Sequence, residues 1–133
     1  MGRLFLVCLF LIPFSLCSIN AQDSPRRQLD LSGVWEIRPD QENRGLEEGW
    51  FKRGFVGDWK DVVVPASWET ALGVDFDGVA WYRKVFRFPK VSRKWRVLLR
   101  FHGAATEARV WVNGKEMGTH LGAWTPFTFD ITG

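Results

Sequence analysis

Two aspartates stand two positions apart in a segment without a regular pattern of apolar residues. Asp75 and Asp77 lie within residues 66–79, which also hold two glycines. A carboxylate is a good acceptor for the neighbouring hydroxyl groups of a ligand, because hydrogen bonds to a charged group are the stronger kind. Asp and Gly also serve turn geometry without any ligand. Residues 66–79 are therefore expected to form a long loop that is either solvated or in contact with a polyhydroxylated ligand.

The same two aspartates make a poor catalytic pair. Carboxylates that cleave glycosides together lie about 5–10 Å apart across the substrate. They usually stand on rigid supports, whereas Asp75 and Asp77 share one irregular loop. Ser67 lacks the G-x-S-x-G surroundings of a hydrolase nucleophile, and His102 and His120 lack the spacing of a metal site. No catalytic residue, metal or cofactor is expected in this chain.

Aromatic residues offer a second kind of chemistry. The chain has eight Trp and eleven Phe but one Tyr. The apolar face of an exposed Trp matches the C–H face of a pyranose ring, and Trp124 lies in a second loop-like stretch together with His120. Packing is the commoner use of Trp, however, and Trp124 is open to both interpretations. Residues Trp35, Trp81 and Trp111 lie within apparent strands and are expected to pack in the core or on a sheet face.

The balance of charge argues against a nucleic-acid partner. The formal net charge is +3, and the basic residues are scattered, whereas nucleic-acid binding needs a concentrated basic surface. The densest basic stretch, residues 90–96, is interpreted as a solvated turn. The length of 133 residues suggests a single domain.

The N-terminus has the layout of a secretory signal peptide. Arg3 precedes an apolar run over residues 4–16, and Ala21 offers a small residue for cleavage. The run is too short to cross a membrane, which takes about 20 apolar residues. We therefore expect residues 1–21 to be removed, residues 22–28 to form a linker, and the product to be secreted or periplasmic. Both cysteines, Cys8 and Cys17, would leave with the signal, so the mature domain could have no disulfide.

The remainder is patterned as short strands. Apolar residues alternate with period two, and turn signals separate the segments, as in half-buried antiparallel strands. Asn113-Gly114 is a strong hairpin signal, because both residues can adopt the positive φ that a type I′ turn requires. Residues 46–51 are expected to form a short helical turn. Strands are expected at residues 31–38, 60–64, 80–88, 95–101, 108–112, 115–118 and 127–131, which predicts an all-β, antiparallel jelly-roll β-sandwich.

Five segments, in this order, resemble the sugar-binding domain of glycoside hydrolase family 2. They are LSGVWEIRPD, WKDVVVPASWE, GVAWYRKVFRFP, the V-W-V-N-G hairpin, and the His-x-Gly loop that runs into T-P-F-T-F-D-I-T. The resemblance covers roughly residues 29–133. The β-glucuronidase branch is the most similar, given Gly45-Leu46, Trp50 and residues 120–127.

The resemblance implies a parent enzyme of three parts: a galactose-binding-like jelly roll, an immunoglobulin-like sandwich and a TIM barrel. In such retaining glycosidases two glutamates of the barrel do the chemistry. The chain is therefore expected to be an N-terminal fragment that lacks the catalytic glutamates and its own last strand or strands, and that is inactive alone. Its expected partners are a carbohydrate and, in the parent, the other two domains; no nucleic acid is expected, nor a membrane after signal cleavage.

The resemblance also indicates where a sugar would bind. It places the 66–79 loop near the mouth of the barrel's active site, with Asp77 at a position where some members carry a polar substrate-pocket residue and Asp75 beside it. The second candidate group is His120 and Trp124, where many members have Tyr in place of Trp124. Two other functions stay open: a stand-alone carbohydrate-binding module without catalysis, and an interaction domain whose exposed aromatic residues dock another protein.

Overall fold

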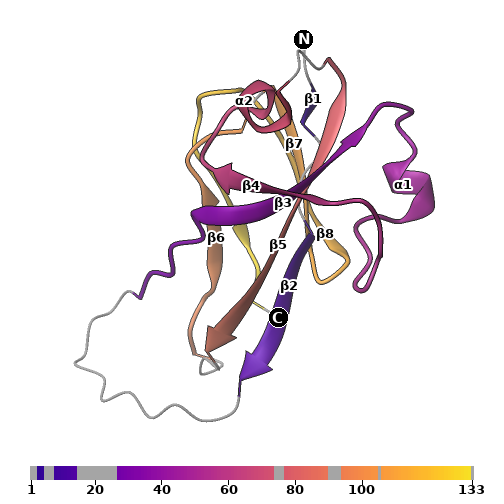
Figure 1. The fold of residues 1–133 in the computed structure, drawn as a ribbon. Coiled ribbons are helices and arrows are strands. Elements are labelled where there is room, and N and C mark those ends of the chain that lie inside the picture. The colour runs from indigo at the N-terminus through magenta and orange to yellow at the C-terminus, as the bar shows by residue number, and fades with distance from the viewer. Residues whose placement is uncertain are drawn as a thin grey trace.

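The computed structural model describes residues 3–4, 8–14, 27–73, 77–89, 94–104 and 106–132. Most of them lie in strands, as the alternating pattern predicts (Figure 1). The strands are β1 (Arg3–Leu4), β2 (Cys8–Phe14), β3 (Gly33–Asp40), β4 (Lys60–Val64), β5 (Val79–Pro89), β6 (Leu98–Phe101), β7 (Glu107–Val112), β8 (Lys115–Leu121) and β9 (Phe127–Asp130), and the helices are α1 (Gly45–Glu48) and α2 (Trp68–Leu72).

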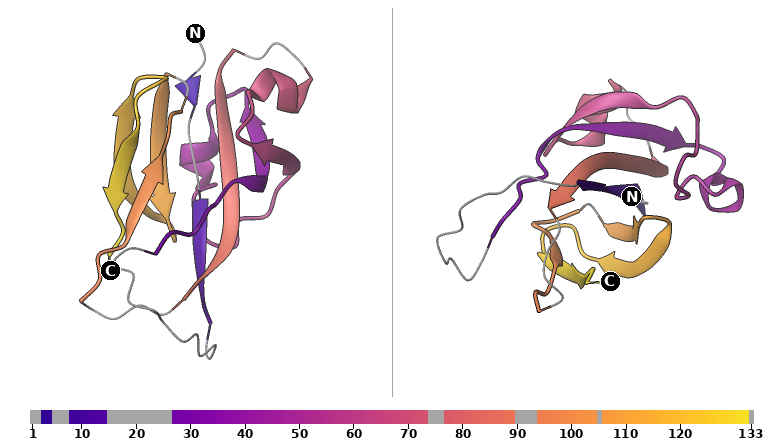
Figure 2. Two further views of the ribbon diagram at one scale, coloured as in Figure 1. Left: turned by 90° about the vertical axis from the view of Figure 1, so that its left-hand side faces the viewer. Right: turned by 90° about the horizontal axis from the view of Figure 1, so that it is seen from below.

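The larger sheet, sheet A, has the strand order β4-β3-β5-β2-β7-β8, with β1 also paired to β5. The pairs β3–β4, β3–β5 and β7–β8 are antiparallel, as the sequence predicts. β1 and β2 differ, because they pair parallel to their neighbours. In Figure 2 the orange and yellow strands gather on one side of β2 and the magenta and pink strands on the other.

The smaller sheet, sheet B, consists of β6 and β9 in antiparallel register. Between the two sheets lies the main core, to which sheet A contributes Trp35, Ile37, Tyr82 and Val110 among others. Sheet B adds Leu99, with the partly buried side chains of β9 and its surroundings packed against it. Strands β3, β5 and β7 contribute alternate residues to this core, which is the physical origin of the period-two pattern.

A second apolar cluster lies on the other face of sheet A. Trp81 and Trp111 stack with ring centroids 5.1 Å apart, and Trp50 lies 6.0 Å from Trp81. The segment that follows β3 covers them, since Leu46, Phe51, Phe55 and Trp59 pack against the cluster. The predicted packing of Trp35, Trp81 and Trp111 is thus confirmed, with the first in the main core and the other two in this second cluster.

Several element bounds agree with the sequence prediction and three do not. The strand expected at residues 115–118 extends to Leu121. The strand over residues 60–64 and the 113–114 hairpin are confirmed, with φ of 53° at Asn113 and 83° at Gly114. The prediction for residues 95–101 was too long, because β6 begins at Leu98 and Trp95 is 39% exposed. The prediction of an irregular loop over residues 66–79 was also incomplete, because α2 forms within it. Neither helix among the described residues is long and apolar enough to cross a membrane.

Candidate functional site

The two predicted sugar-contacting segments lie at the same end of the molecule. α2, which leads toward the start of β5, and the connection from β8 to β9 both lie at the upper end in Figure 1 and in the left view of Figure 2. They belong to different sides of the sandwich: the first lies on the β3–β4–β5 side, and the second joins sheet A to sheet B. The sandwich therefore presents both at one rim, as a shared ligand would require.

The β8–β9 connection is held by specific contacts at its base. The Gly122 amide donates to the Thr106 carbonyl oxygen at 2.8 Å. A Cβ on Gly103 would lie 3.0 Å from the Ala123 carbonyl oxygen, so two connections pack tightly here. Trp124 projects from this base with 92% of its surface exposed. An exposed indole on a supported loop can stack on the apolar face of a ring-shaped ligand.

His120 lies in strand β8, beside this connection, so the prediction that it belongs to the loop was wrong. Its ring stacks on Phe127 with centroids 4.1 Å apart, and its Nε2 lies 2.9 Å from the Thr125 hydroxyl. These contacts tie the end of β8 to the start of β9 on both sides of Trp124. His120 thus orients the loop, and its half-buried ring leaves one edge at the surface.

The opposite side of the rim is built by α2. The Ser67 hydroxyl accepts a hydrogen bond from the Thr70 amide at 3.4 Å, which caps the helix, and Gly73 ends it with a left-handed conformation at φ 68°. Beneath it, burial raises the pKa of Tyr82 to about 12, and the negative charge of Glu69 acts in the same direction. Tyr82 therefore stays a neutral phenol that can donate a hydrogen bond at any physiological pH.

The structure describes three of the four predicted site residues and does not bring those three into one pocket. Asp77 is exposed at the start of the turn into β5. Asp75 lies outside the described residues. His120 lies in β8 and Trp124 in the β8–β9 connection, where Trp124 is exposed to solvent. The described parts thus offer an exposed indole in the β8–β9 connection and an exposed carboxylate before β5.

A different cluster, missed by the sequence reasoning, surrounds a cavity of about 290 Å³ beside α1. Its centre is Asp40, only 4% exposed, whose Oδ1 accepts from the Arg44 amide at 2.8 Å. Its Oδ2 accepts from the Gly45 amide at 2.8 Å and from Trp81 Nε1 at 3.0 Å. Gly45 is required here, because a Cβ would lie 2.8 Å from Asp40 Oδ2 and closer still to the Trp81 ring.

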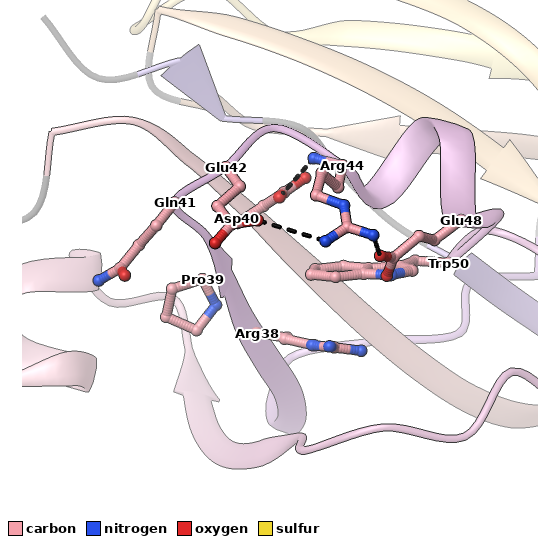
Figure 3. A pocket seen from close by; sticks show the side chains of 8 residues that line it. All are labelled: Arg38, Pro39, Asp40, Gln41, Glu42, Arg44, Glu48 and Trp50. Atoms are coloured by element: carbon pink, nitrogen blue, oxygen red, sulfur yellow. Dashed lines mark hydrogen bonds and ion pairs between the residues drawn. The ribbon is translucent and has the colours of Figure 1, made fainter.

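The remaining charges around this cavity are also engaged (Figure 3). Arg44 pairs with Glu48 at 2.7 Å and with Glu42 at 3.4 Å. The Arg38 guanidinium lies 3.6 Å above the Trp50 ring, an ordinary cation–π geometry. The Asp40 carboxylate has donors and Arg44 has acceptors, whereas the buried Nη1 of Arg38 has no hydrogen-bond partner among the described residues. We interpret the cluster as the set of contacts that holds the 45–59 segment on sheet A. The pattern of residues in the sequence did not predict it.

A metal site is not formed by the residues that the structure describes. No group of three or more His, Cys, Asp or Glu side chains among them is placed to hold an ion.

Most of the chain matches one known protein family. Residues 28–133 match the family model described as "Glycosyl hydrolases family 2, sugar binding domain". The β-glucuronidase of Paenibacillus borealis is 37% identical over 116 residues, which cover 84% of this chain and 19% of that relative. The human β-glucuronidase is 34% identical over 125 residues, with the same two shares. The chain thus spans about a fifth of the length of these relatives.

The fold of this chain is also similar to parts of solved β-glucuronidase structures. A β-glucuronidase from Lactobacillus rhamnosus superposes with a TM-score of 0.71 and 33% identity, covering 92% of this chain and 20% of that one. A β-glucuronidase from Ruminococcus gnavus in complex with an N1-substituted uronic isofagomine gives a TM-score of 0.71 at 27% identity, with the same coverage.

Proposed function

Because this chain belongs to the sugar-binding domains of glycosyl hydrolase family 2, we propose that it is the N-terminal, sugar-binding part of an exported β-glycosidase. The observation that carries the proposal is the match of residues 28–133 to that family, together with relatives that are β-glucuronidases. The substrate class that this favours is the β-glucuronides. The two sheets packed around one core support a jelly-roll topology for the complete domain.

In this proposal the chain binds the sugar and does not cleave it. The carboxylates of a retaining glycosidase stand about 5–5.5 Å apart around the scissile bond, and the family supplies them from its barrel. What this chain supplies is the rim: Trp124 as a stacking platform, His120 as the residue that orients it, and Asp75 and Asp77 as acceptors for sugar hydroxyls. The same rim faces the barrel in the parent enzyme.

Binding by the full 133-residue chain tests this proposal. Glucuronic acid, glucose and galactose would be titrated while ligand resonances are followed by NMR. We expect saturable binding in the millimolar range, as is usual for a shallow sugar site with a free energy of about 4 kcal/mol. Trp124→Ala should weaken it by about tenfold, the loss of one stacking contact. Absence of saturation for all three sugars would refute the binding role.

Matched variants distinguish sugar binding at the rim from sugar binding elsewhere on the surface. Trp95→Ala removes a second exposed indole, just before β6 and outside the rim, and should leave affinity unchanged. Asp77→Asn should weaken binding several-fold, about the value of one charge-assisted hydrogen bond, whereas Asp58→Asn should not. Equal losses in Trp124→Ala and Trp95→Ala would show that the rim is not the site.

Export is the second part of the proposal. Expressed in a host with a general secretory pathway, the chain should appear outside the cytoplasm with a new N-terminus at Gln22. Protein recovered outside the cytoplasm that still begins at residue 1 would contradict the assigned cleavage, and protein retained inside would contradict export.

A further inference from the structure

The 45–59 segment is attached to sheet A differently in its two parts. α1, in the first part, is held through Asp40, which ends β3 and accepts hydrogen bonds from two backbone amides at the start of the helix. The second part, residues 51–59, leads from α1 toward the start of β4 (Figure 1) and is called the strap. Gly49 lies between the two parts and ends α1 in a left-handed conformation, with φ of 69°. A rotation near Gly49 would therefore move the strap without moving α1.

The backbone hydrogen bonds described for the strap join residues of the 45–59 segment to one another. These bonds run from the amides to the carbonyl oxygens as Lys52 to Gly49, Phe55 to Lys52, and Trp59 to Gly57. Contact with sheet A comes from side chains. Arg83 Nη1 donates to the Phe55 carbonyl oxygen at 2.9 Å, and the Phe51 ring stacks on Trp111 with centroids 5.5 Å apart. Departure of the strap would break few backbone hydrogen bonds, which is typical of segments that open locally.

Two buried donors at the strap have no hydrogen-bond partner among the residues that the structure describes. They are Nη1 of Arg38 and Nε1 of Trp59. The first is packed against the strap backbone, because a Cβ added to Gly57 would collide with it. A donor that is removed from water without an acceptor costs free energy. The closed position of the strap carries this cost, whereas an open position would return both donors to water.

A second indole nearby differs in this respect. Trp50 lies just before the strap, and its ring centroid is 6.5 Å from that of Trp59 in an edge-on contact. Its Nε1 donates to Glu48 Oε2 at 2.8 Å, and the Arg38 guanidinium lies over its ring. The two neighbouring indoles thus differ in whether the N–H group is satisfied, and the unsatisfied one belongs to the strap.

We propose that the strap opens away from sheet A while the contacts around Asp40 keep α1 in place, and that this opening uncovers the face of Trp111 on which Phe51 stacks. Gly49 is the expected hinge, because hinges are a few residues in loops or at the ends of elements that absorb the change in φ and ψ. The uncovered indole lies on the face of sheet A that is turned away from sheet B. This proposal does not depend on sugar binding.

Hydrogen exchange of indole N–H groups tests the opening in the full 133-residue chain. NMR would follow the Nε1–H of Trp59 and that of Trp81, which are chemically alike; the second donates to Asp40 and belongs to the part that stays closed. The Trp59 group should exchange at least about tenfold faster than the Trp81 group. Low concentrations of urea should hardly change its rate, because a local opening exposes little surface. Equal rates, or an equal dependence on urea, would overturn the proposal.

Two matched variants test the cost of the unsatisfied donor. Trp59→Phe and Trp50→Phe each remove one indole N–H and keep an aromatic ring. Backbone exchange across residues 51–59 would be measured by mass spectrometry. Trp59→Phe removes a buried donor that has no acceptor, so exchange across the strap should slow by about fivefold or more. Trp50→Phe takes a donor from Glu48 and should not slow it. The proposal is overturned if Trp59→Phe does not slow the exchange, or if both variants slow it equally.

Discussion

At the scale of single residues, Asp40 shows how one buried carboxylate can hold the segment that follows it against sheet A. Its carboxylate accepts three N–H groups, from Arg44, Gly45 and Trp81. Asp40→Ala would leave those donors without their acceptor, and a buried donor that loses its partner costs free energy. We expect the free energy of unfolding to fall by about 3 kcal/mol, measured by urea denaturation.

The matched control for Asp40 is Glu42, whose side chain is 75% exposed in its ion pair with Arg44. Glu42→Ala should change the stability by less than about 0.5 kcal/mol, because exposed ion pairs contribute little. Similar losses in both variants would mean that the three hydrogen bonds of Asp40 do not hold the segment.

Tyr82 gives a prediction about pH, and it is the only tyrosine in the chain. Its pKa is raised from 10.0 to about 12, first by burial and then by Glu69. The unfolded chain therefore ionises first as pH rises. The contribution to stability is fully present below pH 10 and is lost between pH 10 and about 12.

Ultraviolet absorbance of tyrosinate follows this one group directly. The folded chain should titrate near pH 12 and the chain in denaturant near pH 10. Tyr82→Phe should remove the part of the loss of stability at alkaline pH that comes from ionisation of the Tyr82 hydroxyl. A midpoint near pH 10 in the folded chain would show that the hydroxyl is not desolvated.

At the scale of elements, the β7–β8 hairpin is the part of the fold that local sequence determines most directly. Gly114 has φ 83°, and there is room for a methyl group, since the nearest atom to an added Cβ would be the Phe51 carbonyl oxygen at 3.8 Å. Gly114→Ala should therefore destabilise the chain through backbone strain alone, by about 1 kcal/mol. Asn113→Gly, at φ 53°, should be neutral within about 0.5 kcal/mol in thermal unfolding. A harmless Gly114→Ala would show that the turn does not need its positive φ.

Other elements were less accessible to sequence reasoning, for physical reasons. α2 is only five residues long, so its capping residues Ser67 and Gly73 were its only signal. The second cluster was missed as a core because Trp50 and Phe55 come from an irregular segment, and only tertiary contact reveals what they cover. The apolar run over residues 4–16 fits an export signal, and composition alone cannot show the parallel pairing of β2.

For the candidate site, the sugar-binding roles of Asp75, Asp77, His120 and Trp124 stay a prediction. α2 and the β8–β9 connection lie at one end of the sandwich (Figure 1), which is compatible with one ligand near both segments. The role of His120 in orienting the loop follows from its stacking on Phe127, a contact that depends on how β8 and β9 are placed. Sequence spacing does not contain that information.

At the scale of the whole molecule, sheet A separates two apolar clusters that share strands but not side chains. Leu99 belongs to the cluster between the sheets, and Trp50 to the cluster under the 45–59 segment. Substitutions that do not share partners have additive effects on stability. Substitutions on the two faces of sheet A should therefore change the free energy of unfolding independently of each other, even though the chain unfolds in a single transition.

A pair of double-mutant cycles measures this independence. Leu99→Ala and Trp50→Phe, combined, should lower the free energy of unfolding by the sum of the single losses to within about 0.5 kcal/mol. Phe101→Leu and Phe127→Leu provide the matched contrast, because these rings stack at 4.8 Å within one cluster. Their cycle should deviate from additivity by about 0.5–1.5 kcal/mol. Coupling between Leu99 and Trp50 as large as between the two phenylalanines would mean that sheet A transmits strain from one face to the other, and that the outer cover and the main core form one unit.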